Sequence, residues 1–171
     1  MDKRKPKRSA RLLLLLAFAA MLASISASII TYGNSGDDFA RPDLIPTIEQ
    51  ISEQYGVSPE LIEAMIETES RGISTVSNGT CYGLMQVSTR WHTDRAARLG
   101  VDIRNDYGNI LTGVDYLMEL AEDSDDLYYV LGQYNGQSDA QEGKRNDYAD
   151  KILARATELE YLHGKRDYEY R

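Results

Sequence analysis

The chain has 171 residues, of which 42% are hydrophobic and 27% charged, and its formal net charge is -8. This composition is too apolar for a disordered protein, and the length suits one globular domain with an additional segment. A single cysteine excludes a framework of disulfides and a multi-cysteine metal cage.

The N-terminal part of the chain combines a basic cluster with an apolar run. Residues 1–11 hold six Lys or Arg residues and one Asp, so the rest of the chain is more acidic than the total charge indicates. An acidic body argues against a nucleic-acid partner, because binding to phosphates requires a basic face. Residues 12–30 are uncharged, and this run is close to the roughly 20 residues that span a membrane.

The basic flank and the apolar run predict either a transmembrane anchor or a cleaved signal sequence at residues 12–30. A typical signal peptide has only about 7–15 apolar residues, which favours the anchor, whereas small residues near the end of the run offer a cleavage site. We expect a basic cytoplasmic segment at 1–11, a single-pass anchor in the cell membrane and a body on the outer, cell-wall side. Cleavage would make the protein secreted. Residues 31–41, rich in Gly, Asp and Ser, are expected to form a linker.

Apolar residues at helical spacing dominate the rest of the chain, so we expect a mainly α-helical domain over residues 42–163 and a charged tail at 164–171. The first helix begins near Pro42 and stops at Gly56. The helical repeats are Leu44, Ile48, Ile51 and Tyr55; Ile110, Val114, Leu117 and Ala121; Leu127, Val130, Leu131 and Tyr134; and Tyr148, Ile152, Ala156 and Leu159. Strand signals are scarce, and Asn78-Gly79 indicates one small hairpin.

A second helix, beginning after Ser58, carries the most informative residue. Ser58 is a good N-cap, and Pro59 suits the first helical position. Glu69 falls within the apolar arc of this helix, whereas Glu63 and Glu67 fall on the opposite side, which we expect to be solvated. A carboxylate among apolar side chains loses hydration, which raises its pKa as a general acid requires. The alternative is that Glu69 ends the helix and meets water.

A series of short motifs begins at Glu69. They are Glu69-Ser70, Gly83-Leu84-Met85-Gln86, Asn109-Ile110 with Gly113 and Tyr116-Leu117, Tyr134-Asn135-Gly136, and Tyr148 followed by Ile152-Leu153. In order and spacing they resemble the lytic transglycosylase (SLT) family, which is related to goose-type lysozymes. The resemblance covers roughly residues 47–160 and implies a lysozyme-like helical fold.

The resemblance also implies which residues act. It makes Glu69 the catalytic acid and base. In the family, certain positions line the sugar groove, and Ser77, Met85 and Gln86 match them. Other positions lie around the carboxyl group, and Tyr134, Asn135 and Tyr148 match those. The residue types suit these roles, because an amide at Gln86 can donate to and accept from an N-acetyl group, and tyrosines have apolar faces with a polar tip. Core packing is the alternative for Tyr134 and Tyr148.

Other catalytic groups are less well supported. Cys81 with His92 or His163 as base would make a cysteine enzyme, but no third orienting group is apparent, so a buried thiol is favoured. The two histidines lack ligand spacing, which argues against zinc. A second carboxyl group would come from Asp94, Asp102 or Asp106. None of these aspartates shows a signal beyond capping or solvation.

The expected protein is a peptidoglycan lytic transglycosylase that cleaves the β-1,4 bond between N-acetylmuramic acid and N-acetylglucosamine. Glu69 would protonate the leaving oxygen and then take the proton of the muramic C6 hydroxyl, which closes a 1,6-anhydro ring. Neither a metal nor a cofactor is implied. Two alternatives stay open: a hydrolytic muramidase, and a catalytically inactive glycan-binding or assembly module. Wall remodelling and local wall opening for a secretion or conjugation machine both fit the expected partners, peptidoglycan strands and the membrane.

Overall fold

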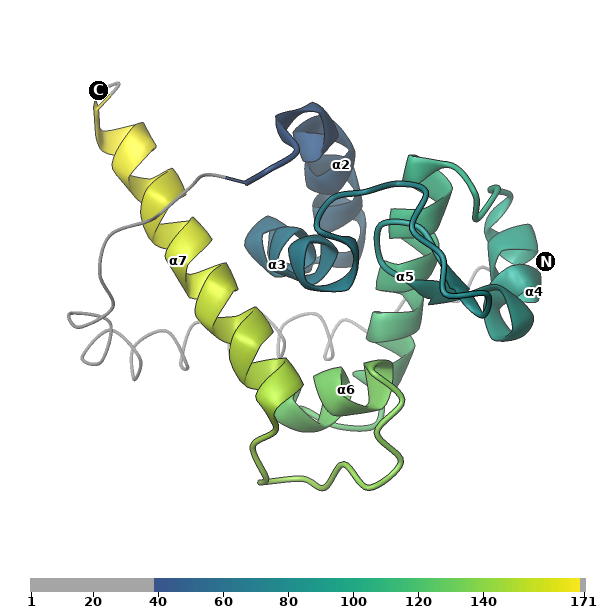
Figure 1. Ribbon diagram of the computed structural model, residues 1–171. Helices are drawn as coiled ribbons and strands as arrows, with labels where there is room; N and C mark the ends of the chain where they lie inside the picture. The colour runs from purple at the N-terminus through teal and green to yellow at the C-terminus, as the bar shows by residue number, and fades with distance from the viewer. Residues whose placement is uncertain (1–38, 170–171) are drawn as a thin grey trace.

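The computed structural model describes residues 39–169, and this part of the chain is mainly α-helical, as predicted (Figure 1). Its elements are the 3-10 helix η2 (Pro42–Leu44), the helices α2 (Ile45–Tyr55) and α3 (Pro59–Ser70), the strands β1 (Cys81–Tyr82) and β2 (Val87–Ser88), and the helices α4 (Thr89–Leu99), α5 (Asp106–Leu120), α6 (Leu127–Tyr134) and α7 (Asp147–Glu169). The expected anchor at residues 12–30 lies outside the described residues. Between residues 39 and 169, no helix is both long and apolar enough to cross a membrane.

The first two helices begin and end where the sequence indicates. Gly56 ends α2 with a φ of 69°, a left-handed conformation that glycine adopts without steric cost. The Ser58 side chain caps α3 by accepting a hydrogen bond from a first-turn backbone amide at 3.3 Å, and Pro59 takes the first helical position. At the other end, Arg71 adopts a left-handed φ of 55° and stops the helix. Glu69 therefore lies in the last turn of α3.

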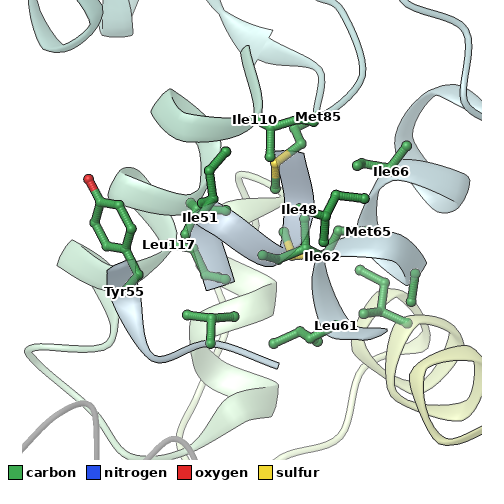
Figure 2. Close-up of a cluster of buried hydrophobic side chains, with 14 of the residues drawn as sticks. Ile48, Ile51, Tyr55, Leu61, Ile62, Met65, Ile66, Met85, Ile110 and Leu117 are labelled. Carbon is green, nitrogen blue, oxygen red and sulfur yellow. The ribbon is translucent and has the colours of Figure 1, made fainter. Parts of the chain in front are cut away.

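Helix α3 is the central helix of the domain. It packs against α7 on one side and against α2 on another, with α5 on the far side of α2 and α3 from α7 (Figure 1). Figure 2 shows a cluster of buried apolar side chains that includes Ile48 and Ile51 of α2, Ile62 and Met65 of α3, and Ile110 and Leu117 of α5. Burial of this apolar surface is the main favourable contribution to folding.

Because α3 is enclosed, the side that we expected to be solvated is covered. Glu63 is only 1% exposed, and its Oε2 lies 3.6 Å from Nε2 of His163 on α7. Glu67 is half-buried, and its carboxylate pairs with Arg155 of α7 at 2.6 Å. The prediction that Glu63 and Glu67 face solvent is therefore wrong. A helical wheel describes one helix and cannot show that α7 packs against its polar side.

The region between α3 and α5 contains a helix that the sequence pattern does not indicate. Only Arg95 and Ala96 are buried in α4, so this helix lacks the apolar stripe by which helices are recognised. Its boundary residues are nevertheless typical, because Gly100 ends it with a left-handed φ of 74°.

The predicted hairpin is present but small. Asn78-Gly79 turns the chain between Ser77 and Tyr82, which form an isolated antiparallel bridge. The two strands themselves, β1 and β2, pair antiparallel across residues 83–86. The turn at Asn78-Gly79 was therefore predicted correctly, whereas the pairing of β1 with β2 was not predicted.

The ends of the folded domain lie outside the boundaries that composition suggested. Phe39 is buried in the core, and the Arg41 guanidinium donates to the Gly72 carbonyl oxygen at 2.5 Å. Residues 39–41, which we expected in the linker, therefore belong to the domain. At the other end α7 continues to Glu169, so the expected tail at 164–171 begins as helix. The first end of the domain is set by tertiary contacts of Phe39 and Arg41, and the second by the continuation of α7.

A buried amide of α5 holds the loop between the two strands. Asn109 is 1% exposed, and its Oδ1 accepts the Met85 amide at 2.9 Å. Its Nδ2 donates to the carbonyl oxygens of Tyr82, at 2.9 Å, and Ile103, at 3.0 Å. Gly83 has a φ of 82°, and a Cβ there would collide with the Asn109 side chain. The loop is therefore locked onto α5.

We expect Asn109→Ala to lower the free energy of unfolding by about 2–4 kcal/mol, because three buried hydrogen bonds are lost and two carbonyl groups and one amide lose their partner. Urea denaturation followed by circular dichroism measures this loss. Gln50→Ala, at an exposed position of α2, is the control and should stay within about 0.5 kcal/mol of the parent. Equal losses in the two variants would contradict a locking role for Asn109.

Candidate active site

Glu69, in the last turn of α3, is partly buried, and its Oε1 accepts a hydrogen bond from the Tyr148 hydroxyl of α7. Burial raises the pKa of Glu69 above its ordinary value of 4.5. The hydrogen bond from Tyr148 and the ammonium group of Lys151 act in the opposite direction but do not outweigh burial. The carboxyl group therefore keeps its proton to a higher pH than an exposed glutamate does, which is the property of a general acid.

Two tyrosines from different helices lie beside this carboxyl group. Tyr148 comes from the first turn of α7, and Tyr134 is the last residue of α6. The Tyr134 hydroxyl donates to the Met85 carbonyl oxygen at 2.9 Å. Burial, together with the charge of Glu69, raises the pKa of both hydroxyl groups, so both are neutral donors at neutral pH. The structure thus brings together Glu69, Tyr134 and Tyr148 from three helices.

The approach of Tyr134 requires a glycine in α5. A Cβ at Gly113 would lie 2.8 Å from the Met85 Sδ and 3.0 Å from the Tyr134 hydroxyl oxygen. Any larger residue would push these two groups away. Gly113 therefore has a packing role behind the candidate site.

The two candidate residues of the loop between β1 and β2 differ in burial, because Met85 is buried and Gln86 is partly exposed. Met85 is 0% exposed, so its side chain lies beneath the surface and only its backbone takes part in the arrangement around Tyr134. Gln86 is partly exposed, and its Nε2 donates to the carbonyl oxygens of Val76, at 3.1 Å, and Gly83, at 2.9 Å. Both amide hydrogens are engaged within the loop, which leaves Oε1 as the atom of Gln86 for a ligand. The structure thus does not provide the donor role expected for this amide.

Ser77 and Asn135 are exposed. The Ser77 hydroxyl donates to the Cys81 carbonyl oxygen at 3.0 Å and accepts the Gly79 amide at 3.2 Å. Asn135 is the C-cap of α6. Neither side chain bonds to Glu69 within residues 39–169, and their contacts with a substrate stay predictions.

Cys81 lies near Glu69, and the sequence pattern did not predict this proximity. Burial, and to a smaller degree the charge of Glu69, raises the pKa of the Cys81 thiol. A protonated thiol is a poor nucleophile. His92 instead contacts Arg95, and His163 contacts Glu60, so neither histidine is paired with the thiol. This arrangement argues against a cysteine enzyme.

The three aspartates considered as second carboxyl groups lie elsewhere. Asp106 accepts hydrogen bonds from Ser74, at 3.0 Å, and Arg41, at 3.4 Å, whereas Asp102 accepts a backbone amide and Asp94 is exposed. Within residues 39–169, none of these three aspartates is among the groups that shift the pKa of Glu69, which are Tyr148 and Lys151. The described part of the chain contains no group of His, Cys, Asp and Glu side chains suited to hold a metal ion.

The comparisons with known proteins identify the family. The family model of the transglycosylase SLT domain matches residues 46–155, and the chain therefore belongs to this family. Its fold is similar to that of an inactive mutant of the lytic transglycosylase Slt from Pseudomonas aeruginosa, with a TM-score of 0.59 and 17% sequence identity. That match covers 92% of this chain and 29% of the other, so this chain spans less than a third of the length of that protein. The search of curated proteins found no match.

The raised pKa of Glu69 has a consequence for stability. Below about pH 4 the carboxyl group is mainly protonated in the folded and the unfolded chain. As the pH rises from the ordinary pKa of the unfolded chain to the higher pKa of the folded chain, the unfolded chain loses its proton first, so stability falls and then stays at the lower level. We expect Glu69→Gln to melt close to the parent near pH 4 and above it at neutral pH.

Thermal melts from about pH 4 to pH 8 measure this difference, with Glu53→Gln at an exposed position of α2 as the matched control. A difference between the Glu69 variant and the parent that does not change with pH would contradict the raised pKa.

Proposed function

We propose that this protein is a peptidoglycan lytic transglycosylase that cleaves the β-1,4 bond between N-acetylmuramic acid and N-acetylglucosamine, with Glu69 as its catalytic acid and base. The observation that carries the proposal is the partly buried Glu69 carboxyl group, whose pKa is raised and whose oxygen is held by Tyr148, in a domain of the SLT family. Such a group retains the proton that the leaving oxygen needs.

The proposed reaction has two proton transfers. Glu69 donates its proton to the glycosidic oxygen while the bond to C1 of the muramic acid breaks. The Glu69 carboxylate then takes the proton of the C6 hydroxyl of the same sugar, and O6 forms a bond to C1. The product is a 1,6-anhydro ring, and the acid is restored. Between the two steps the Tyr148 hydroxyl and the nearby Lys151 ammonium group favour the carboxylate.

The neighbours of Glu69 favour this route over hydrolysis. Hydrolysis of a glycosidic bond usually employs two carboxyl groups on either side of the bond. Two tyrosines, one thiol and one ammonium group interact with Glu69, and none of these four is a carboxylate. A single carboxyl group suits a reaction in which the N-acetyl group of the substrate stabilises the anomeric centre. A hydrolytic muramidase is therefore the second candidate.

We expect Glu69→Gln to lose activity on purified peptidoglycan by about 10⁴-fold or more, because one group serves both proton transfers and the amide cannot perform either. Mass spectrometry of the released fragments measures rate and product together. Glu53→Gln is the matched control, because its carboxylate is exposed on α2, and it should retain the parent rate. A loss of less than tenfold in the Glu69 variant would overturn the assignment.

The product formed by the parent protein separates the candidate functions. Anhydro ends support the transglycosylase, and reducing ends would support the muramidase. If the parent binds glycan strands and releases no fragment, the domain is an inactive glycan-binding or assembly module.

We also propose that residues 12–30 anchor the protein in the cell membrane with the folded domain on the cell-wall side. Support comes from the uncharged run and the basic cluster that precedes it. In this position the domain would remodel the wall or open it locally for a secretion or conjugation machine.

Cell fractionation tests the anchor. We expect the full chain in the membrane fraction, with the domain accessible to protease added from outside. A soluble protein whose mature N-terminus lies near Ala27 would show that the segment is a cleaved signal sequence.

A further inference from the structure

A row of aromatic rings leads from the candidate active site toward α4. Tyr134, beside Glu69, is tilted against Tyr116 of α5, with ring centroids 5.5 Å apart. Tyr116 in turn contacts the His92 ring of α4, at a centroid distance of 4.3 Å. Tyr116 and His92 are partly exposed, so this end of the row is accessible from the surface. Its ring spacing is comparable to the length of one sugar unit in a β-1,4-linked strand.

The neighbour of His92 determines where its ring hydrogen lies. The Arg95 Nε donates to the His92 Nδ1 at 3.3 Å. Because arginine has no acceptor, Nδ1 must carry a lone pair, and the hydrogen of the neutral ring is on Nε2. Burial and the nearby Arg95 charge lower the pKa of His92, which keeps the ring in this neutral form.

Arg95 is itself held in place. It is 7% exposed and forms ion pairs with Asp115, at 2.6 Å, and Glu119, at 2.8 Å, both on α5. Its guanidinium group also lies 5.4 Å from the centroid of the Tyr116 ring. The two rings and the cation therefore support one another, and the orientation of His92 is set before any ligand arrives.

The Nε2 hydrogen of His92 is not used by the fold. Within residues 39–169 the ring makes one hydrogen bond, through Nδ1. The Nε2 atom has no partner there and is not buried. The atom is thus a solvent-accessible donor at the end of an aromatic row. Sugars offer the complementary groups, because a pyranose ring has an apolar face and its hydroxyl and acetamido oxygens accept hydrogen bonds.

We infer that Tyr116 and His92 form a sugar-binding subsite that holds an N-acetylated hexosamine of the glycan strand away from the bond that is cleaved. Tyr116 supports the apolar face of the sugar, and Nε2 of His92 donates to a hydroxyl or acetamido oxygen. Arg95 is a positioning residue for both rings. The inference rests on the proposed function, since it adds a second contact to the strand that Glu69 cleaves.

Kinetics on glycan strands of two lengths test the subsite. With the full chain and peptide-free strands, His92→Ala should raise KM for long strands about five- to tenfold, because the hydrogen bond and the ring contact with Tyr116 are both lost, while kcat stays near that of the parent. Strands too short to reach from Glu69 to His92 should show no change in KM. His92→Phe keeps the ring contact with Tyr116 and removes the donor, so KM for long strands should rise less than in His92→Ala.

Asp94→Asn is the matched control, because Asp94 is exposed and lies two residues after His92 in α4, roughly 200° around the helix. It should leave KM unchanged for both strand lengths. Thermal melts of all three variants verify that they fold. Equal KM values for the parent, His92→Ala and His92→Phe on long strands would overturn the subsite.

Binding without turnover gives an independent measurement. In the Glu69→Gln protein, the NMR signals of the His92 ring should shift when long peptide-free strands are added and stay in place with short ones. Signals that do not move with long strands would overturn the subsite even if the parent is an active transglycosylase. A parent that forms no anhydro product but shows this shift would overturn the proposed function and support the subsite.

Discussion

The position of the loop between β1 and β2 depends on the buried Asn109 amide. Three backbone groups form hydrogen bonds with this side chain. Because unpaired polar groups are costly in the interior, the loop has one favourable position against α5. The Met85 carbonyl oxygen then accepts the hydroxyl of Tyr134, which draws the end of α6 toward Glu69. A single amide on α5 thereby sets how the loop and the end of α6 meet at the carboxyl group.

The enclosure of α3 that stabilises the core also gives its two last glutamates different properties. Glu67 pairs with the Arg155 cation, and this contact raises the pKa of the arginine. Glu69 has a hydroxyl partner, Tyr148, and burial raises the pKa of its carboxyl group. Helix α7 supplies both partners. Two carboxyl groups only two residues apart thus differ, one in an ion pair and the other with a raised pKa, because of what α7 places against them.

Neutral donors lie beside the Glu69 carboxyl group and along the row of rings, next to the cations Lys151 and Arg95. Tyr134 and Tyr148 are neutral at neutral pH, and burial raises the pKa of both hydroxyl groups further. Burial lowers the pKa of His92, which favours its neutral form. Neutral donors and aromatic faces match uncharged sugar units better than ionised groups would, because an ion must lose more hydration when a ligand covers it. The row of rings therefore suits the proposed subsite for a glycan strand.

The sequence by itself determined most helices, the caps at Ser58 and Gly56, and the place of Glu69 on an apolar arc, because capping and helical periodicity are local properties. It also contained the motifs of the family. Only the tertiary structure decided that Glu67 is paired with a cation, that the amide hydrogens of Gln86 are engaged within the loop, and that His92 contacts a ring of α5. These outcomes depend on side chains far away along the chain, and the pattern of one segment contains no information about what packs against it.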